Sequence, residues 1–579
     1  MLLTVPGPGS AAPDKSAGDL ILAARQDLAR DDGIAAQVRL KQAMAQGATR
    51  KTVAAYMGQA LLAQDEPDEA RKWLAGGEFS PASAAYGFRA LARLEREEGH
   101  LPAAGKAFDR AIALTPDDAA MWVEIGRLRY AGGEHLLAIE AADHAVQLDP
   151  RNVRALEFKG QIVRDRHGLA GALPWFEAAL LQAPGDVSVL GEYAATLGEL
   201  DRARDMLVVT RKMLEIEPGN PRAYYLQAVM AARAGEYRLA RVLLGKTRDK
   251  LKALPGAILL EGVLELKADN PALAVEAFER LVRLRPADAR ARDLLARAIF
   301  ESGEYDYLVE RFGRAASDPG ASVYLQTLVG RTYENLDRRD LAASLLDFAA
   351  RRRTPHIRPT GSGSAVAVLI AQRRAGEAQA MASAAASADP GFYDNLSLAG
   401  DAQLAAGNGE SAAAYYAQAS RIRLPESLLT RRVEALLAAR RPADAAGLAN
   451  AYLYYNPTSR TAIGLVAGMA ARAGDWKRAA ALYGHLVASG GGQDARLLAD
   501  LAYAQMGAGN AALAEGTAQR AYRLQRSSAV TTQAWGLALA TLGKRREAAS
   551  ALLAKARAIS GDNPSLARAR LRLAGLPDS

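Results

Sequence analysis

The sequence predicts an all-α protein built as a right-handed α-solenoid, a superhelix of stacked helical pairs. Prolines recur every 34 residues at Pro116, Pro150, Pro184 and Pro218, and a fixed period near 34 is typical of repeated helix–turn–helix units. Alanine and leucine dominate a hydrophobic content of 50%, and both favour helices. No run of alternating β-branched residues is long enough for a strand. Because each unit of a solenoid contacts only its neighbours, 579 residues need no single large core.

One unit, residues 119–150, shows the pattern most clearly. Large and small side chains share one face of its first helix at helical spacing: Trp122, Ile125, Gly126 and Tyr130. Two glycines, Gly132 and Gly133, end that helix. Alanines mark the inner face of the second helix: Ala138, Ala142 and Ala145. Two antiparallel helices approach closely only where neither presents bulk, so these small positions have a packing cause.

This pattern resembles the tetratricopeptide repeat family, of the bacterial type, whose repeat has a small residue at position 8, alanine at 20 and an aromatic residue at 24. Small residues recur at position 8: Ala92, Gly126, Gly160, Ala194, Ala228, Gly262, Ala296 and Gly330. Position 20 is mostly alanine: Ala104, Ala138, Ala172, Ala240, Ala274 and Ala342, with Met206 and Leu308 as departures. Aromatic residues at position 24 are expected to fill the gap to the next unit: Phe108, Phe176, Phe278 and Phe312.

The predicted order along the chain has six segments. Residues 1–15 form a flexible tail or a signal-peptide remnant, residues 16–84 divergent terminal units, and residues 85–350 the regular array. Residues 351–364 form a basic loop in which two prolines and a Gly/Ser run stop any helix. Residues 365–563 form a second, basic array, and residues 564–579 a capping helix and tail. This gives roughly sixteen helical pairs.

The second array follows the family pattern closely only over residues 398–425, which include Gly400, Ala412 and Tyr416. Later units, from about residues 427, 461, 495 and 529, are weaker. Continuing the 34-residue period places these alanines at position 20: Ala446, Ala480, Ala514 and Ala548.

Charge and composition limit the classes of function. The net charge is +9, but residues 420–579 carry 22 Lys+Arg against 10 Asp+Glu, which leaves −3 for the first 419 residues. The basic end suits an acidic protein, an anionic membrane surface or a nucleic acid, or it only solubilises alanine-rich helices.

There is no cysteine, which excludes thiolate chemistry. No stretch approaches the ~18 apolar residues of a membrane span. The expected location is cytoplasmic as written, or periplasmic if the start is a truncated signal peptide.

No motif predicts catalysis. Residues 240–247 are the closest approach to a phosphate-binding loop, but Ala240 stands where that loop needs its first glycine. The six histidines form no HExxH motif and no i,i+4 metal-binding pair. We therefore expect no enzymatic activity, no catalytic residues, no cofactor and no metal.

The resemblance implies a partner-binding groove, because positions 2, 5, 9 and 12 of each first helix line the concave face in this family. Mapped onto this sequence, they give Tyr86, Arg89, Arg93, Arg96, Arg127, Tyr130, Arg154 and Arg164, with Glu157 among them. Guanidinium groups pair carboxylates bidentately, and tyrosine supplies rigid contact area, so this wall suits an acidic peptide or a terminal carboxylate. An ordinary solvated helix face, with nearby glutamates neutralising the arginines, is the equal alternative.

The leading hypothesis is therefore a non-enzymatic scaffold or adaptor that binds an acidic or extended segment of a partner protein in its concave groove. A first alternative, from family analogy and the unusual N-terminus, is an assembly factor for export of polysaccharide or protein through the cell envelope. A second is a nucleic-acid binder that uses the basic C-terminal third. Few aromatic residues are interleaved with the arginines of that third, which argues against a base-stacking platform.

Overall fold

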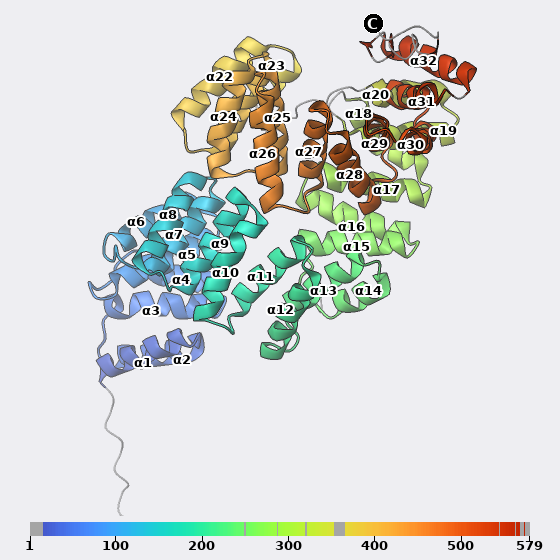
Figure 1. Ribbon diagram of the computed structural model, residues 1–579. Helices are drawn as coiled ribbons and strands as arrows, with labels where there is room; N and C mark the ends of the chain where they lie inside the picture. Colours follow the sequence, from blue (N-terminus) through green and yellow to red (C-terminus); the bar gives the residue numbers. More distant parts are fainter. Residues whose placement is uncertain are drawn as a thin grey trace, which may run out of the picture. The chain divides into compact units, whose positions relative to one another are not determined.

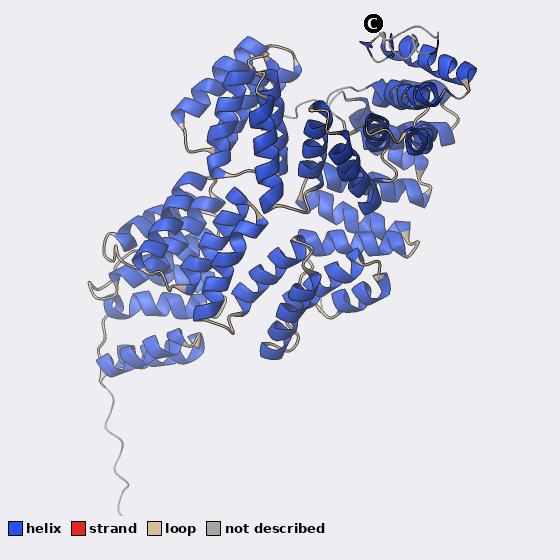
Figure 2. Ribbon diagram, in the orientation of Figure 1, coloured by secondary structure: helices blue, strands red, loops and turns tan. Residues whose placement is uncertain are grey.

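The computed structural model describes residues 16–247, 250–286, 288–318, 321–351, 365–543 and 545–561, together with residues 563, 564, 566, 567 and 573. Within these residues every regular element is helical, with thirty-two α-helices and one π-helical turn and no strand (Figure 2). The prediction of an all-α helical repeat protein is confirmed.

The chain divides into two compact units, Met1–Ile162 and Val163–Ser579, with the division inside helix α9. Unit 1 contains the following helices and the start of α9: α1 (Ala17–Ala29), α2 (Gly33–Ala45), α3 (Arg50–Leu62), α4 (Pro67–Leu74), α5 (Ala84–Glu97), α6 (Leu101–Ile112), α7 (Ala119–Ala131), α8 (His135–Leu148) and α9 (Val153–His167).

Unit 2 contains the end of α9 and the remaining elements (Figure 1). Its first half comprises α10 (Leu169–Gln182), α11 (Val187–Glu199), α12 (Ala203–Ile216), α13 (Pro221–Arg233), α14 (Tyr237–Gly245), α15 (Pro255–Lys267), α16 (Pro271–Leu284), α17 (Ala289–Ser302), α18 (Tyr305–Ser317), α19 (Val323–Asn335) and α20 (Arg339–Arg351). Its second half comprises α21 (Ala365–Ala371), α22 (Ala375–Ala388), α23 (Tyr393–Ala405), α24 (Gly409–Ile422), α25 (Glu426–Ala438), α26 (Pro442–Tyr455), α27 (Arg460–Arg472), α28 (Trp476–Leu486), η1 (Val487–Gly491), α29 (Ala495–Gly507), α30 (Ala511–Leu524), α31 (Ala529–Leu542) and α32 (Arg546–Ser560).

Consecutive helices form pairs, so the described helices give sixteen pairs, in agreement with the sequence. We call the odd-numbered first helix of each pair the A-helix and the even-numbered second helix the B-helix. A-helices of successive pairs also contact one another, as α3 contacts α5 and α29 contacts α31. This gives each unit a wall of neighbouring A-helices.

The small positions have the packing role that the sequence predicts. All six alanines of the regular array at position 20 are buried, as are Met206 and Leu308. A Cβ on Gly262 would lie 2.5 Å from the ring of Phe278, and one on Gly400 would lie 2.3 Å from the ring of Tyr416. In both pairs the position-24 ring packs directly on a backbone without a side chain. The expected burial of Phe108, Phe176, Phe278 and Phe312 is also confirmed.

The predicted register is wrong by one residue in three late units. The buried alanines are Ala445, Ala479 and Ala549 rather than Ala446, Ala480 and Ala548, whereas Ala514 is correct. Helices α25 and α27 begin at Glu426 and Arg460, one residue earlier than the 34-residue period places them. Before α32, helix α31 has fourteen residues, one more than α29, so the buried alanine of α32 comes one residue later than the period predicts.

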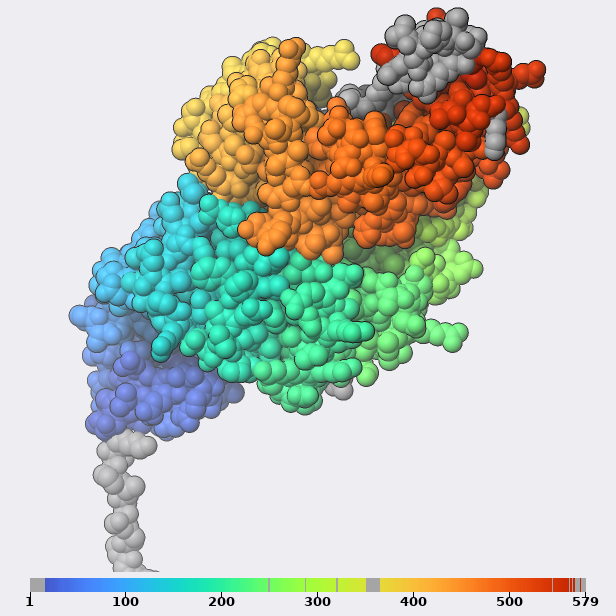
Figure 3. Space-filling model, in the orientation of Figure 1, coloured from blue at the N-terminus to red at the C-terminus, as the bar shows by residue number. Residues whose placement is uncertain are grey.

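Distant segments of unit 2 meet where the α24–α25 and α26–α27 turns contact α9, α10 and α11. The amide of Leu424 donates to the Asp165 carbonyl (3.2 Å), and the Thr458 hydroxyl donates to the Glu199 carbonyl (2.9 Å). The buried Asn456 side chain accepts from the Leu169 amide (3.2 Å). In Figure 3 the orange surface near residue 450 lies directly against the teal surface near residue 180, in agreement with the contact between α10 and α26.

Three predicted segments lie wholly or partly outside the described residues: the tail 1–15, almost all of the loop 351–364 and most of the capping segment 564–579. The predicted domain boundaries remain predictions. Among the described helices, none is both long and apolar enough to cross a membrane.

Candidate functional site

The predicted groove residues lie on three successive A-helices. Four belong to α5, two to α7 and two to α9, and the last of them, Arg164, belongs to unit 2. The structure therefore brings Tyr86, Arg89, Arg93, Arg96, Arg127, Tyr130 and Arg154 together on the A-helix wall of unit 1. Each of these positions is buried in part or half-exposed.

Two arginines of α5 bind one glutamate of the next A-helix. Arg89 donates to Glu124 Oε1 from both Nε (3.1 Å) and Nη2 (2.7 Å), and Arg93 Nε donates to Glu124 Oε2 (2.9 Å). Arg89 also contacts Asp118 at 3.3 Å. Glu124 is thus held by guanidinium groups that reach across from the preceding repeat.

At two further places a pair of arginines, one of them on the preceding A-helix, binds one glutamate, and we call the three groups the arginine–glutamate clusters. Cluster 1 is Arg89, Arg93 and Glu124; cluster 2 is Arg127, Arg154 and Glu157; cluster 3 is Arg164, Arg222 and Glu192. In cluster 2, Glu157 Oε2 lies 3.5 Å from Arg127 and 2.8 Å from Arg154. In cluster 3, which belongs to unit 2, Glu192 lies 2.9 Å from Arg164 and 2.7 Å from Arg222.

In every cluster the carboxylate is the buried partner and the guanidinium is the exposed one. The glutamate side chains are 3–15% exposed, whereas the arginine side chains are 21–48% exposed. Burial alone would raise the pKa of Glu124, but hydrogen bonds from Arg93 and Arg89 hold it below its ordinary value. Burial would also raise the pKa of Glu192, but the charges of Arg164 and Arg222 hold it below its ordinary value. Glu124 and Glu192 therefore stay ionised at neutral pH and fix their guanidinium partners in place.

The remaining groove residues flank the clusters on unit 1. The Tyr86 ring packs 5.1 Å from that of Tyr56, and burial raises the pKa of the Tyr86 hydroxyl. Tyr130 packs edge-on against His135 at 4.9 Å. Arg96 lies 3.9 Å from Glu97, a loose and exposed pair. The charges of Arg93 and Arg89 act on the Tyr86 hydroxyl, so this ring lies near cluster 1. The groove assignment itself remains a prediction.

Sequence reasoning missed the glutamates that organise this surface. Glu157 was noted only as one groove residue, and Glu124 and Glu192 were not considered. The sequence does contain a signal for these glutamates. Each lies on an A-helix, and one of its arginine partners lies on the A-helix before it. Glu124 comes 31 residues after Arg93, and Glu157 comes 30 residues after Arg127. Pairing charges one period apart would have found them.

Unit 2 contains a cavity of about 890 Å³ on its A-helix wall, beneath the α24–α25 and α26–α27 turns. Charged side chains dominate its lining: Arg164, Arg222, Arg233, Arg290, Arg423 and Arg460, with Asp165, Glu192, Glu199 and Glu426. Burial raises the pKa of the Asp165 carboxyl, although the charge of Arg423 opposes this. Of the predicted groove residues, only Arg164 lines this cavity.

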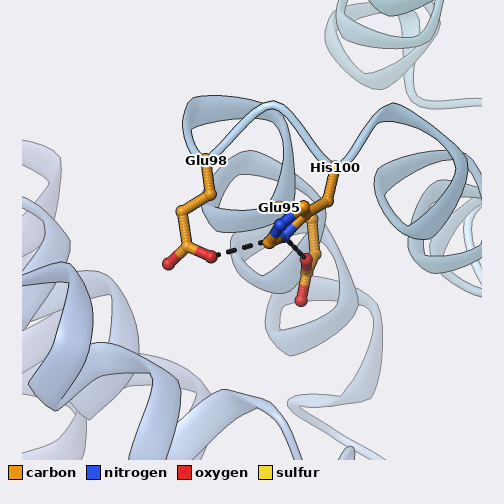
Figure 4. Close-up of side chains that lie close together, drawn as sticks. All are labelled: Glu95, Glu98 and His100. Atoms are coloured by element: carbon orange, nitrogen blue, oxygen red, sulfur yellow. Dashed lines mark hydrogen bonds and ion pairs between the residues drawn. The ribbon is translucent and has the colours of Figure 1, made fainter.

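Glu95, Glu98 and His100 form a small cluster at the α5–α6 turn, with ligand atoms within 4.8 Å of one another (Figure 4). His100 Nδ1 lies 3.0 Å from Glu95 and 3.4 Å from Glu98. Arg71 of α4 binds both carboxylates, and its hydrogen bond is the main cause of the lowered pKa of Glu95. Because Arg71 already binds both carboxylates, we derive no metal site from the cluster.

Paired helices, a wall of A-helices and side chains presented along that wall define a helical-repeat protein. A family model for the tetratricopeptide repeat matches residues 89–153, 124–187 and 259–306. The matches span most of α5, all of α6 to α10, most of α15 and all of α16 and α17, and the predicted small positions in these helices are buried. These segments are therefore tetratricopeptide repeats, and such repeats support a protein-interaction scaffold as the general class of function.

Comparison with solved structures finds several helical-repeat chains. One, from the APC/C hetero-tetramer Cut9–Hcn1, is 13% identical with a TM-score of 0.44, and 96% of each chain is covered. YrrB, described as having an unusual peptide-binding site, is 24% identical with a TM-score of 0.27 over 30% of this chain and 90% of its own. Human IFIT1 bound to m7Gppp-AAAA is 16% identical with a TM-score of 0.38 over 68% and 95%. No curated protein matches the sequence. The assignment rests on the repeat match and the helix packing, since all three TM-scores are below 0.5.

Proposed function

We propose that this protein is a non-enzymatic scaffold that binds an extended, acidic segment of a partner protein along the A-helix wall of unit 1. The observation that carries the proposal is the pair of arginine–glutamate clusters 1 and 2 on this wall. They place exposed guanidinium groups at repeat spacing and hold each against a buried carboxylate.

A guanidinium has five N–H donors, and the cluster contacts use only part of this capacity. Arg127, for example, contacts Glu157 through Nη2 alone, at 3.5 Å. The remaining donors can bind a carboxylate of the partner in the bidentate geometry that arginine favours. Because the buried glutamate already fixes the side chain, binding costs less rotamer entropy than it would for a free arginine. Tyr86 and Tyr130 add rigid contact area beside clusters 1 and 2.

The test is affinity capture from a lysate of the source cell. Sequence alone suggests the variant Arg89→Glu, Arg93→Glu and Arg127→Glu, but the structure shows that it would crowd new carboxylates around Glu124 and Glu157 and endanger the fold. A better variant combines Arg89→Gln, Arg93→Gln and Glu124→Gln, which removes the whole cluster and leaves no buried charge unpaired.

The matched control is Lys41→Gln, Lys106→Gln and Asp109→Asn on B-helices α2 and α6. It changes the net charge by the same amount, and all three side chains are exposed. We expect the cluster variant to lose the captured protein and the control to retain it. Equal capture by both variants would refute the groove assignment. Capture that disappears after nuclease treatment would instead favour the nucleic-acid alternative, and a captured export component would favour the envelope-assembly alternative.

A further inference from the structure

A second cavity adjoins the charged cavity of unit 2 and differs from it in character. It has a volume of about 530 Å³ and is lined mainly by apolar side chains of α12, α13 and the α14–α15 connection, including Met206, Val229, Met230 and Leu254. The two cavities share part of their walls, namely Glu192, Ala195 and Glu199 of α11 and Arg222 and Arg233 of α13. A charged chamber and an apolar chamber therefore meet at this shared wall.

An irregular repeat accounts for the apolar chamber. Helix α14 has nine residues, whereas the neighbouring B-helices α12 and α16 have fourteen. The connection that replaces the missing turns contributes Leu251 and Leu254 to the chamber wall. Leu254 is 40% exposed and Val229 is half-buried, so apolar surface is open to a ligand here rather than closed by packing.

The charges of the larger chamber favour an anion, and Arg233 is the arginine of the shared wall that is left for it, beside Glu192 and Glu199. Glu192 is already bound by Arg164 and Arg222. Arg233 is exposed and donates to the Gly198 carbonyl at 2.9 Å; among the described residues it forms no ion pair with a carboxylate. The larger chamber contains six arginines and four acidic side chains, a formal surplus of two positive charges. Each chamber lies within or close to the ~300–1,000 Å³ range of small-ligand sites.

We propose that the two chambers form one binding site for an amphiphilic carboxylate, with its carboxylate at Arg233 and its apolar group against Val229 and Met230. Because the same arginines line both chambers, the charged and the apolar parts belong to one ligand and lie a few bonds apart. Two sources have this chemistry: a free organic acid with an apolar chain, and the last residue of a polypeptide that ends in an apolar side chain. This site is separate from clusters 1 and 2.

Isothermal titration calorimetry of the intact chain tests the proposal with octanoate as the probe. We expect saturable 1:1 binding of octanoate, at least tenfold weaker binding of uncharged octanamide, and no saturation with acetate, which lacks the apolar group. Acetyl-Gly-Gly-Leu and its C-terminal amide distinguish the sources. Tighter binding of the free peptide than of octanoate identifies a polypeptide end, and the reverse order identifies a free acid; either supports the site.

Two variants and two controls locate the binding. Val229→Phe fills the apolar chamber and should abolish octanoate binding, whereas Val208→Phe on α12, where the side chain is 65% exposed, should not affect it. Arg233→Gln should weaken binding at least tenfold, whereas Arg238→Gln on α14, an exposed arginine outside both cavities, should not. The proposal is overturned if neither octanoate nor the free peptide saturates the protein, or if Val229→Phe binds octanoate like the parent. Neither result depends on partner capture, because the capture variant lies in unit 1.

Discussion

Gly168 offers a sharp test of the contact between the two halves of unit 2. It ends α9 with φ 114° and ψ 177°, a backbone region that is essentially restricted to glycine and costs other residues about 1–3 kcal/mol. A Cβ at this position would lie 2.4 Å from the Asn456 Nδ2 atom, so Gly168→Ala must also displace the Asn456 side chain. That side chain accepts from the Leu169 amide, a hydrogen bond worth about 1 kcal/mol.

We therefore expect Gly168→Ala to lower the free energy of unfolding by about 2–4 kcal/mol in total. The matched control is Gly235→Ala. Gly235 also has positive φ (83°), but a Cβ there meets nothing within 4 Å, so only the cost of the left-handed backbone, about 1–2 kcal/mol, applies. Equilibrium urea unfolding followed by circular dichroism gives both values.

Asn456→Ala separates the two contributions to the Gly168 effect. In an Asn456→Ala background the clash is absent, so Gly168→Ala should cost about 1 kcal/mol less than it does in the parent. Gly235→Ala should cost the same in both backgrounds, within about 0.5 kcal/mol. If Gly168→Ala shows no coupling to Asn456→Ala, the two turns do not touch in solution and the closure of the charged cavity is wrong.

Three further predictions test the packing and the buried charges. Ala138→Trp should overpack the α7–α8 pair and cost at least about 1–3 kcal/mol of stability, because Ala138 is fully buried. The control Glu140→Trp, on the exposed face of α8, should be tolerated. Equal melting temperatures for the two variants would show that the repeat phase is wrong. Tyr416→Phe should lower the free energy of unfolding by about 1–3 kcal/mol, because the Tyr416 hydroxyl donates to the fully buried Asp401 carboxylate at 2.7 Å. In the same thermal melts, Tyr415→Phe should be nearly neutral. Burial raises the pKa of Asp500 from 3.8 to about 6, so the folded state favours the protonated acid and loses stability as the pH rises from about 4 through 6. The melting temperature of Asp500→Asn should therefore rise relative to that of the parent between pH 4 and pH 7.5. A difference in melting temperature that does not change with pH would contradict this sign.

The sequence predicts the helical pairs well because their signals are local. Gly132 and Gly133 end one helix, and Ala138 can only lie where two helices approach closely. The one-residue shift at Ala445, Ala479 and Ala549 was missed because the lengths of helices and connections vary by one residue between units, which a fixed period does not encode.

The candidate site was predictable only in part. The arginines on α5, α7 and α9 follow from the repeat phase, and their glutamate partners follow once charges are compared one repeat apart. The cavity of unit 2 does not, because Arg164 and Arg423 meet there only after many small rotations between successive repeats have accumulated. The contact between Leu169 and Asn456 depends on the same accumulated rotations between repeats.

Site-specific photo-crosslinking tests the central claim, that the A-helix wall holds the partner. A benzophenone amino acid would replace Arg96 on A-helix α5 in one variant and Lys106 on B-helix α6 in another; both positions reach solvent. After capture and irradiation, we predict a covalent adduct with the captured protein at position 96 and none at position 106. An adduct at position 106 without one at position 96 would place the partner on the opposite surface and contradict the account.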